Sequence, residues 1–183
     1  SMPMVSRICN QIILMDRGEA KFQGENVSEA IDLYYTRFAD NDSNIVFDNG
    51  NLLLDNIDIL CENLVDNIKL LKWYDDLIIK LSFRLKKNNF KELQCAVIIV
   101  DKEQRPVGAI RNDDNIKILN KTNYQLEYTV KNIQLSKGTY SLNIVFYLDG
   151  SPSYRANSVF SFQVSHEKMT WEPFMLNADL KII

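Results

Sequence analysis

The chain has 183 residues, which suits one domain with a short appendage. Hydrophobic residues make up 46% and charged residues 25%, a balance that favours a packed core over a disordered chain. The 24 acidic and 21 basic side chains nearly cancel, so we expect no attraction to phosphate backbones and exclude nucleic acid as a partner.

The first predicted elements lie in residues 1–44. Residues 8–23 have the pattern of two short strands joined by the Asp16-Arg17-Gly18 turn, in which glycine permits a positive φ. Asn26 and Glu29 have the spacing of a capping box at the start of a helix, and apolar positions then recur on one helical face. A segment this short cannot bury that face by itself, so the face must pack against something else.

A β-sandwich is predicted for residues 45–183. The polar residues 40–51 are expected to be a linker that ends in the Asp48-Asn49-Gly50 turn signal. Short alternating runs follow at roughly ten-residue spacing without helices between them, a pattern typical of an antiparallel sandwich. The tail, Trp171 to Ile183, is expected to add an edge strand or to pair with a second copy. The predicted strands are residues 52–60, 77–85, 95–100, 107–110, 124–130, 140–148 and 154–164.

The first unit resembles the last stretch of an ABC-transporter nucleotide-binding domain. That family commonly has a Cys-Asp pair, an apolar strand, a glycine turn, a second strand, a glycine and a helix that ends in a tyrosine. Here Cys9-Asn10, the strand to Met15, the Gly18 turn, Gly24 and the helix ending in Ile31-Asp32-Leu33-Tyr34 follow the same order. Asn10 stands where aspartate is usual in the family.

The strand-rich part resembles the extension of Wzt-type ATPase subunits, which export O-antigen and related cell-envelope polysaccharides. Leu135 to Leu142 is similar to a recurring L-x-x-G-x-Y-x-L motif in those extensions. Asp101 to Gly108 resembles their D-x-x-G-x-x-V-x-G hairpin, with Gln104 or Arg105 where glycine is common.

This resemblance implies a specific architecture and set of partners. The fold class would be all-β: an immunoglobulin-like antiparallel β-sandwich with a short N-terminal strand-hairpin-helix appendage. Residues 1–44 would be the tail of the nucleotide-binding domain, and residues 45–183 a carbohydrate-binding domain that holds lipid-linked glycan of the lipopolysaccharide pathway. The expected partners are that polysaccharide, the nucleotide-binding domain, the membrane permease and a second copy in a homodimer. The setting would be the cytoplasmic, inner face of the cell membrane.

We expect no catalysis by this chain. The G-x-x-x-x-G-K-[ST] phosphate loop is absent, so the chain should not hydrolyse ATP, although its parent subunit should. His166 is the only histidine and forms neither a metal cluster nor a triad by itself. The doublets Asp75-Asp76 and Asp113-Asp114 give little support to a third hypothesis, a glycoside hydrolase, because neighbours in a strand point to opposite faces.

The three cysteines favour a reducing, cytoplasmic setting. Cys9, Cys61 and Cys95 are odd in number and far apart, unlike a disulfide framework. Their spacing matches no zinc pattern, so we expect no metal and no other cofactor.

A glycan site needs aromatic platforms for sugar rings beside amides and charged groups for hydroxyls. Polar positions on the strands, opposite the apolar core positions, supply these groups, and an ordinary solvated sheet face is the alternative interpretation. The alternative function is a protein-interaction or dimerisation module without a sugar site, using the apolar residues around Trp171, Phe174, Met175 and Leu176. The predicted carbohydrate-binding residues are Arg84, Asn143, Tyr147, Arg155, Asn157 and Gln163.

Overall fold

The fold was obtained as a computed structural model, which divides the chain into two compact units, Ser1–Asn44 and Ile45–Ile183. The structure describes residues 5, 8–16, 18–27, 29–30, 33–34, 44–65, 68–87, 89–112, 115–119, 121–168, 172–178 and 181.

The first unit contains the predicted hairpin. Strands β1 (Ile12–Asp16) and β2 (Glu19–Gly24) pair antiparallel, and Gly18 turns between them with φ +85°. The prediction of a strand from Ile8 is wrong over its first residues. Ile8 is helical there, and the Cys9 N–H donates to the Val5 carbonyl at 3.0 Å, a bond of helical spacing.

A capping box starts the helix of the first unit, as predicted. The Glu29 N–H donates to Asn26 Oδ1 at 3.2 Å, and Asn26 Nδ2 donates back to Glu29 Oε2 at 3.1 Å. Val27 and Ala30, which follow the cap, are buried. Tyr34, which also belongs to the predicted apolar face, is helical and half-buried, whereas Ile31 and Phe38 lie outside the described residues.

The second unit is a β-sandwich, which confirms the predicted all-β fold class. Its strands pair antiparallel except for Ile68–Lys72 and Ser151–Ser165, which pair parallel with each other. All seven predicted strands are present, and short strands that alternation did not reveal lie between them. The Ile45–Asp48 strand overturns part of the predicted linker; all four of its side chains are exposed, so it lacks the period of a half-buried strand. The strands are β3 (Ile45–Asp48), β4 (Leu52–Ile59), β5 (Leu64–Val65), β6 (Ile68–Lys72), β7 (Leu77–Leu85), β8 (Glu92–Asp101), β9 (Pro106–Arg111), β10 (Ile116–Lys117), β11 (Asn123–Val130), β12 (Gly138–Leu148) and β13 (Ser151–Ser165).

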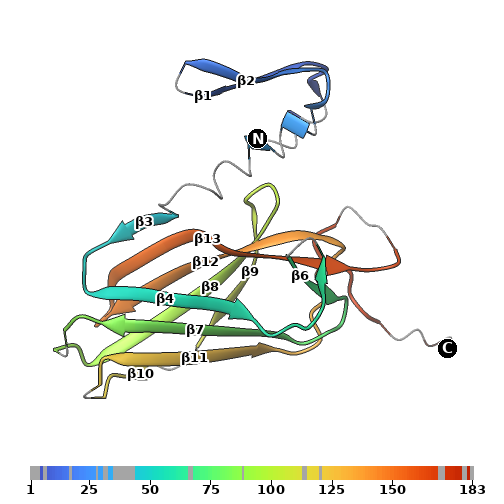
Figure 1. The fold of residues 1–183 in the computed structure, drawn as a ribbon. Helices are drawn as coiled ribbons and strands as arrows, with labels where there is room; N and C mark the ends of the chain where they lie inside the picture. The colour runs from blue at the N-terminus through green and yellow to red at the C-terminus, as the bar shows by residue number, and fades with distance from the viewer. Residues whose placement is uncertain are drawn as a thin grey trace. The chain divides into compact units, whose positions relative to one another are not determined.

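Two sheets face each other across one core (Figure 1). The large sheet has the order β10-β8-β12-β13-β6-β5, with β9 paired to β8 and β3 paired to β13. The second sheet has three strands in the order β11-β7-β4. Phe83 of β7 meets Phe146 of β12 with ring centroids 4.8 Å apart, so the core joins the two layers through aromatic contacts.

Alternation along the strands determines which side chains fill this core. In β7 the side chains of Leu77, Ile79, Leu81, Phe83 and Leu85 are at most 2% exposed, while the intervening ones face outward. The same period in β12 buries Ile144 and Phe146 and leaves their neighbours on the opposite side. Each sheet therefore has a buried face and an outer face, and the outer faces position the polar residues.

The C-terminal tail lies against its own sandwich. The Met175 N–H donates to the Gln134 carbonyl at 2.9 Å, and Trp73 Nε1 donates to the Met175 carbonyl at 2.9 Å. Phe174 forms an isolated antiparallel bridge with Leu135 rather than a full edge strand. Trp171 lies outside the described residues.

Candidate functional site

The outer face of the large sheet brings together four of the predicted residues. Asn143 and Tyr147 alternate with the buried core residues of β12. Arg155 lies between the buried Tyr154 and Ala156 of β13, and Gln163 lies between two further buried residues of the same strand. Since β12 and β13 are hydrogen-bonded neighbours, these four side chains share one face.

These residues form a long strip rather than a compact pocket. Tyr147 lies opposite Gln94 of β8, and Gln163 lies opposite Thr139 of β12. Thr139 and Tyr147 are eight positions apart on β12, a span of about 27 Å at about 3.4 Å per residue. The strip matches an extended ligand better than a single small molecule.

A hydrogen-bonded bridge crosses the middle of the strip. The Ser158 N–H donates to Asn143 Oδ1 at 2.7 Å, and the Ser158 hydroxyl lies 3.4 Å from Ser141 Oγ and from Gln104 Oε1. Gln104 comes from the turn between β8 and β9 and reaches past β12 to β13. Ser141, on the intervening strand, is only 7% exposed. The bridge therefore occupies the Asn143 carbonyl oxygen and divides the strip in two.

Asn157 occupies the bulge beside this bridge. Leu142 pairs with Phe160 and Ile144 pairs with Ala156, so residues 157–159 bulge opposite Asn143. The Asn157 Oδ1 atom is buried without a hydrogen-bond partner among the described residues. Asn157 thus presents no exposed side-chain oxygen to a ligand in this structure.

Arg84, the sixth predicted residue, lies on the other layer. It belongs to β7, at the outer face of the three-stranded sheet. Its Nε atom donates to both carboxylate oxygens of Asp55 at 2.9 and 3.0 Å, and its Nη2 lies 2.7 Å from Asp55 Oδ1. The hydrogen bond to Asp55 raises the pKa of Arg84. The structure therefore does not bring Arg84 together with the other five residues.

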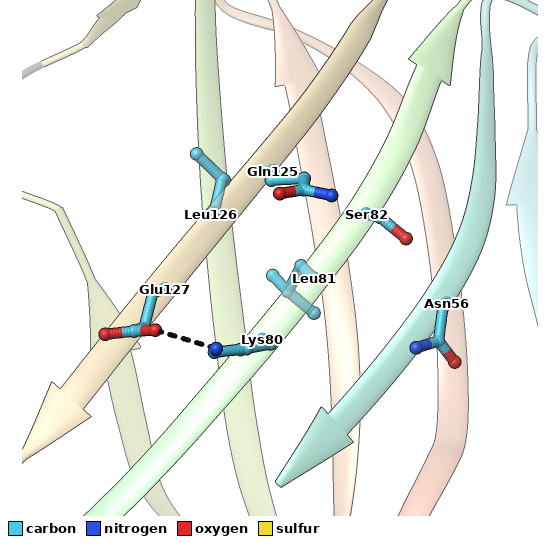
Figure 2. A pocket seen from close by; sticks show the side chains of 7 residues that line it. All are labelled: Asn56, Lys80, Leu81, Ser82, Gln125, Leu126 and Glu127. Carbon is cyan, nitrogen blue, oxygen red and sulfur yellow. Dashed lines mark ion pairs between the residues drawn. The ribbon is translucent and has the colours of Figure 1, made fainter. Parts of the chain in front are cut away.

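A hollow of about 370 Å³ lies on that three-stranded face (Figure 2). Ser82 pairs with Gln125 on one side and with Asn56 on the other, which forms a row of amide, hydroxyl and amide groups. None of these three side chains has a hydrogen-bond partner in the part of the chain described. The lining residues are Asn56, Lys80, Leu81, Ser82, Gln125, Leu126 and Glu127.

The short Ser82 side chain accounts for the hollow. Its neighbours on the same face of β7, Lys80 and Arg84, are long. Lys80 Nζ lies 3.5 Å from Glu127 Oε2, an ion pair that borders the hollow in Figure 2. Together with the Arg84–Asp55 pair, this leaves a polar surface whose charges are locally balanced.

Other candidate chemistry has a structural explanation. Asp76 accepts hydrogen bonds from Lys131 Nζ at 2.6 Å and from the Asn132 N–H at 3.1 Å. The hydrogen bond from Lys131 lowers the pKa of Asp76. His166 packs edge-on against Trp73 with ring centroids 4.9 Å apart. Asp113 and Asp114 lie outside the described residues.

The described part of the chain contains no group of three histidine, cysteine or acidic residues placed to bind a metal ion. It also contains no helix with the length and hydropathy of a membrane span.

Comparison with solved structures identifies the architecture. The chain superposes on the crystal structure of the C-terminal domain of Wzt with a TM-score of 0.65 and 12% identity, covering 75% of this chain and 87% of that one. This chain has a Wzt-like fold. The Wzt-like fold is all that a likeness at this identity shows. No family model matches the sequence, and no curated protein matches it.

Two other solved structures resemble this chain more weakly. A Niemann-Pick type C2 protein from Japanese carpenter ant has a TM-score of 0.47 and 9% identity, covering 65% of this chain and 98% of that one. A β-glucuronidase from Parabacteroides merdae has a TM-score of 0.40 and 17% identity, covering 63% of this chain and 14% of that one. Neither supports an argument about function.

The sheet topology adds three more residues to the outer face of the large sheet, because alternation within a strand does not say which sheet the strand belongs to. Gln94 of β8 pairs with Tyr147 of β12, and Arg111 of β9 pairs with Ala96 of β8. Phe47 of β3 pairs with Arg155. Their membership of this face depends on which strands share the large sheet, and no single strand carries a signal for that.

Proposed function

We propose that this chain recognises a polysaccharide as a module of a polysaccharide-exporting ABC transporter. The observation that carries the proposal is the outer face of the large sheet. Tyr147, Arg155 and Gln163 lie there, and their side chains have no hydrogen-bond partner among the described residues. The Wzt-like fold and the resemblance of residues 1–44 to a nucleotide-binding domain support the assignment to a transporter.

The chemistry of this face suits a hydroxylated polymer. The half-buried Tyr147 offers a ring for the apolar face of a sugar, and the amides of Gln94 and Gln163 can both donate to and accept from hydroxyl groups. Each such contact is worth only about 1 kcal/mol net, so affinity would come from several contacts along the strip. Specificity would come from polar groups that a wrong sugar leaves unpaired.

The remaining parts of the proposal follow from the same assignment. The glycan would be a lipid-linked, O-antigen-type chain, bound on the cytoplasmic side of the cell membrane. Residues 1–44 would connect the module to the nucleotide-binding domain, which works with the membrane permease, and the module would form a homodimer. ATP hydrolysis would belong to the parent subunit and not to this chain, whose sequence lacks the phosphate loop.

A titration with envelope polysaccharide from the source organism tests the proposal. Amide NMR spectra of the chain should shift for β12 and β13, and Tyr147→Ala should weaken binding by about tenfold, as expected for loss of an aromatic contact. Phe174→Ala is the matched control, because Phe174 is 42% exposed on the tail and should leave binding unchanged. An intact fold that responds to none of the envelope glycans would contradict the proposal.

A protein-interaction module is the second candidate function. Phe174 and Leu176 are 42% and 74% exposed, which favours an apolar contact with a partner. In that case Phe174→Ala would dissociate an oligomer seen by sedimentation, and Tyr147→Ala would have no effect on any binding. The same two variants therefore separate the two functions.

A further inference from the structure

One row of side chains crosses five strands on the outer face of the large sheet. Val145 of β12 pairs with Ala96 of β8 on one side and with Arg155 of β13 on the other. Ala96 pairs in turn with Arg111 of β9, and Arg155 pairs with Phe47 of β3. The row therefore has an arginine on each side of two small side chains.

Both arginines point away from the core. Arg155 is exposed between two residues of the core, Tyr154 and Ala156. Arg111 is exposed, and the preceding residue of β9, Ile110, packs against the core. Alternation within each strand thus places the two guanidinium groups on the same solvent-facing side of the sheet.

These two arginines have no ion pair within the described part of the chain, where no carboxylate pairs with Arg111 or Arg155. Some other cations of the sandwich form ion pairs, as Arg84 does with Asp55 and Lys131 does with Asp76. The row is thus a positively charged surface on a chain whose net charge is -3. The three-stranded face differs, because its Lys80 and Arg84 form ion pairs.

The spacing of the arginines sets the size of the ligand. They are separated by three strand-to-strand steps, which amounts to about 14 Å at about 4.8 Å per step. A single sugar is too short to reach both guanidinium groups. Ala96 and Val145 between them are small, so a polymer can lie close to the sheet across the strands, and Phe47 is 45% exposed at one end as a platform for a ring.

We propose that this row binds an acidic polysaccharide whose repeated anionic groups pair with Arg111 and Arg155. The inference rests on the proposed glycan-recognition function. It adds the charge of the ligand and a line of contacts across the strands, which meets the strip along β12 and β13 at Arg155. Guanidinium groups bind carboxylates and phosphodiesters alike, so uronic acid units and phosphorylated sugars share the required chemistry.

Binding of defined oligosaccharides tests the charge of the ligand. The probes are oligogalacturonate, a neutral mannan oligosaccharide of equal length and the same mannan carrying phosphate, each titrated by calorimetry at low and high salt. Oligogalacturonate or phosphorylated mannan should bind more tightly than the neutral probe, and added salt should weaken that binding. The stronger of the two acidic probes identifies the anionic group.

Arg111→Gln and Arg155→Gln test the residues. Each should weaken the binding of the acidic probe by about tenfold, the value expected for one charge-assisted hydrogen bond. Arg84→Gln is the matched control on the opposite sheet and should leave acidic binding unchanged. Monomeric galacturonate should depend on one arginine at most, because it cannot span the row.

The possible outcomes separate this inference from the proposed function. If the neutral probe binds as tightly as the acidic probes, the claim that the ligand is acidic is wrong, but glycan recognition is not contradicted. The same holds if Arg84→Gln and Arg155→Gln weaken the binding of the acidic probe equally. Binding of envelope polysaccharide without binding of either acidic probe would also contradict the acidic ligand but not glycan recognition. Spectra of each variant that match those of the unmodified chain ensure that a loss reflects the site and not the fold.

Discussion

Asn143 and Ser158 are joined across two neighbouring strands of the large sheet, where the Ser158 N–H donates to Asn143 Oδ1 at 2.7 Å. Ser158 has φ +48°, an uncommon value for a residue with a side chain, and it lies in the β13 bulge. The contact satisfies a backbone donor that the interrupted ladder leaves free. Asn143 therefore has a structural role in addition to its predicted place on a binding face.

Replacing Asn143 should reveal this structural role. Asn143→Ala removes the acceptor of the Ser158 N–H, so the free energy of unfolding should fall by about 1 to 2 kcal/mol in urea denaturation. Gln94→Ala is the control. The exposed Gln94 side chain donates to Asn115 Oδ1 at the surface, so its loss should change stability by less than about 0.5 kcal/mol. Equal stability of the two variants would show that the bulge does not depend on this bond.

The aromatic contact between the layers should dominate the stability of the sandwich. Phe83 is 1% exposed and packs on Phe146 at 4.8 Å and on Tyr124 at 5.5 Å between ring centroids. Phe83→Ala should lower the free energy of unfolding by about 3 to 5 kcal/mol, because a large cavity remains. Leu53→Ala, at a side chain that is 41% exposed, should cost far less in the same urea titration.

Acid should weaken the sandwich partly through Asp149. Its Oδ1 atom accepts hydrogen bonds from the Lys91 and Glu92 N–H groups at 2.9 Å each. Both bonds lower the pKa of Asp149, and the bond from Glu92 has the larger effect. A carboxyl whose pKa is lower in the folded state stabilises the fold above its unfolded pKa of about 3.9. That contribution disappears as the pH falls through the lower folded pKa.

Asp149→Asn isolates this acid dependence. Asparagine tolerates the positive φ of 47° at this position and keeps an acceptor oxygen but does not titrate. The variant should be less stable than the unmodified chain near neutral pH, and the difference should shrink when urea unfolding is repeated near pH 3. A difference that stays constant with pH would exclude Asp149 as a source of the acid sensitivity.

Thiol reactivity should follow burial. Desolvation raises the pKa of Cys95 to about 12, so its thiolate is scarce at neutral pH, and the side chain is 2% exposed. Cys9 is exposed. Iodoacetamide should therefore modify Cys9 long before Cys95, as read by peptide mass spectrometry, and denaturant should remove the difference. Early modification of Cys95 would mean that β8 opens readily.

Strands could be predicted from sequence where burial imposes a period of two on them. β7 shows this period along its whole length and β12 shows it from Leu142 onward, and their bounds agree closely with the predictions. β3 could not be found in this way, because all its side chains are exposed and it forms by pairing with the distant β13.

The candidate site depended more strongly on information between strands. Alternation correctly put Asn143, Tyr147, Arg155 and Gln163 on outward positions, but the same rule applied to Arg84 on the other layer. Only the register shows that Arg111 lies in the row of Arg155. Register depends on pairing partners distant in sequence, and no property of a single strand specifies it.

Filling the hollow of the three-stranded face decides which outer face binds glycan. Ser82 pairs with both Gln125 and Asn56 in the middle of the hollow, so Ser82→Leu should close it while leaving the core face of β7 unchanged. We expect the affinity for envelope polysaccharide to stay within about twofold, because Tyr147 and the unpaired arginines lie on the opposite sheet.

The result is compared with Tyr147→Ala in the same calorimetric titration. Ser82→Ala is the control for the Ser82 hydroxyl, since it removes one polar group without filling the hollow. If Ser82→Leu abolishes binding and Tyr147→Ala does not, the glycan site lies on the three-stranded face. Its unpaired amides and balanced ion pairs would then select a neutral sugar, because no uncompensated cation lines the hollow.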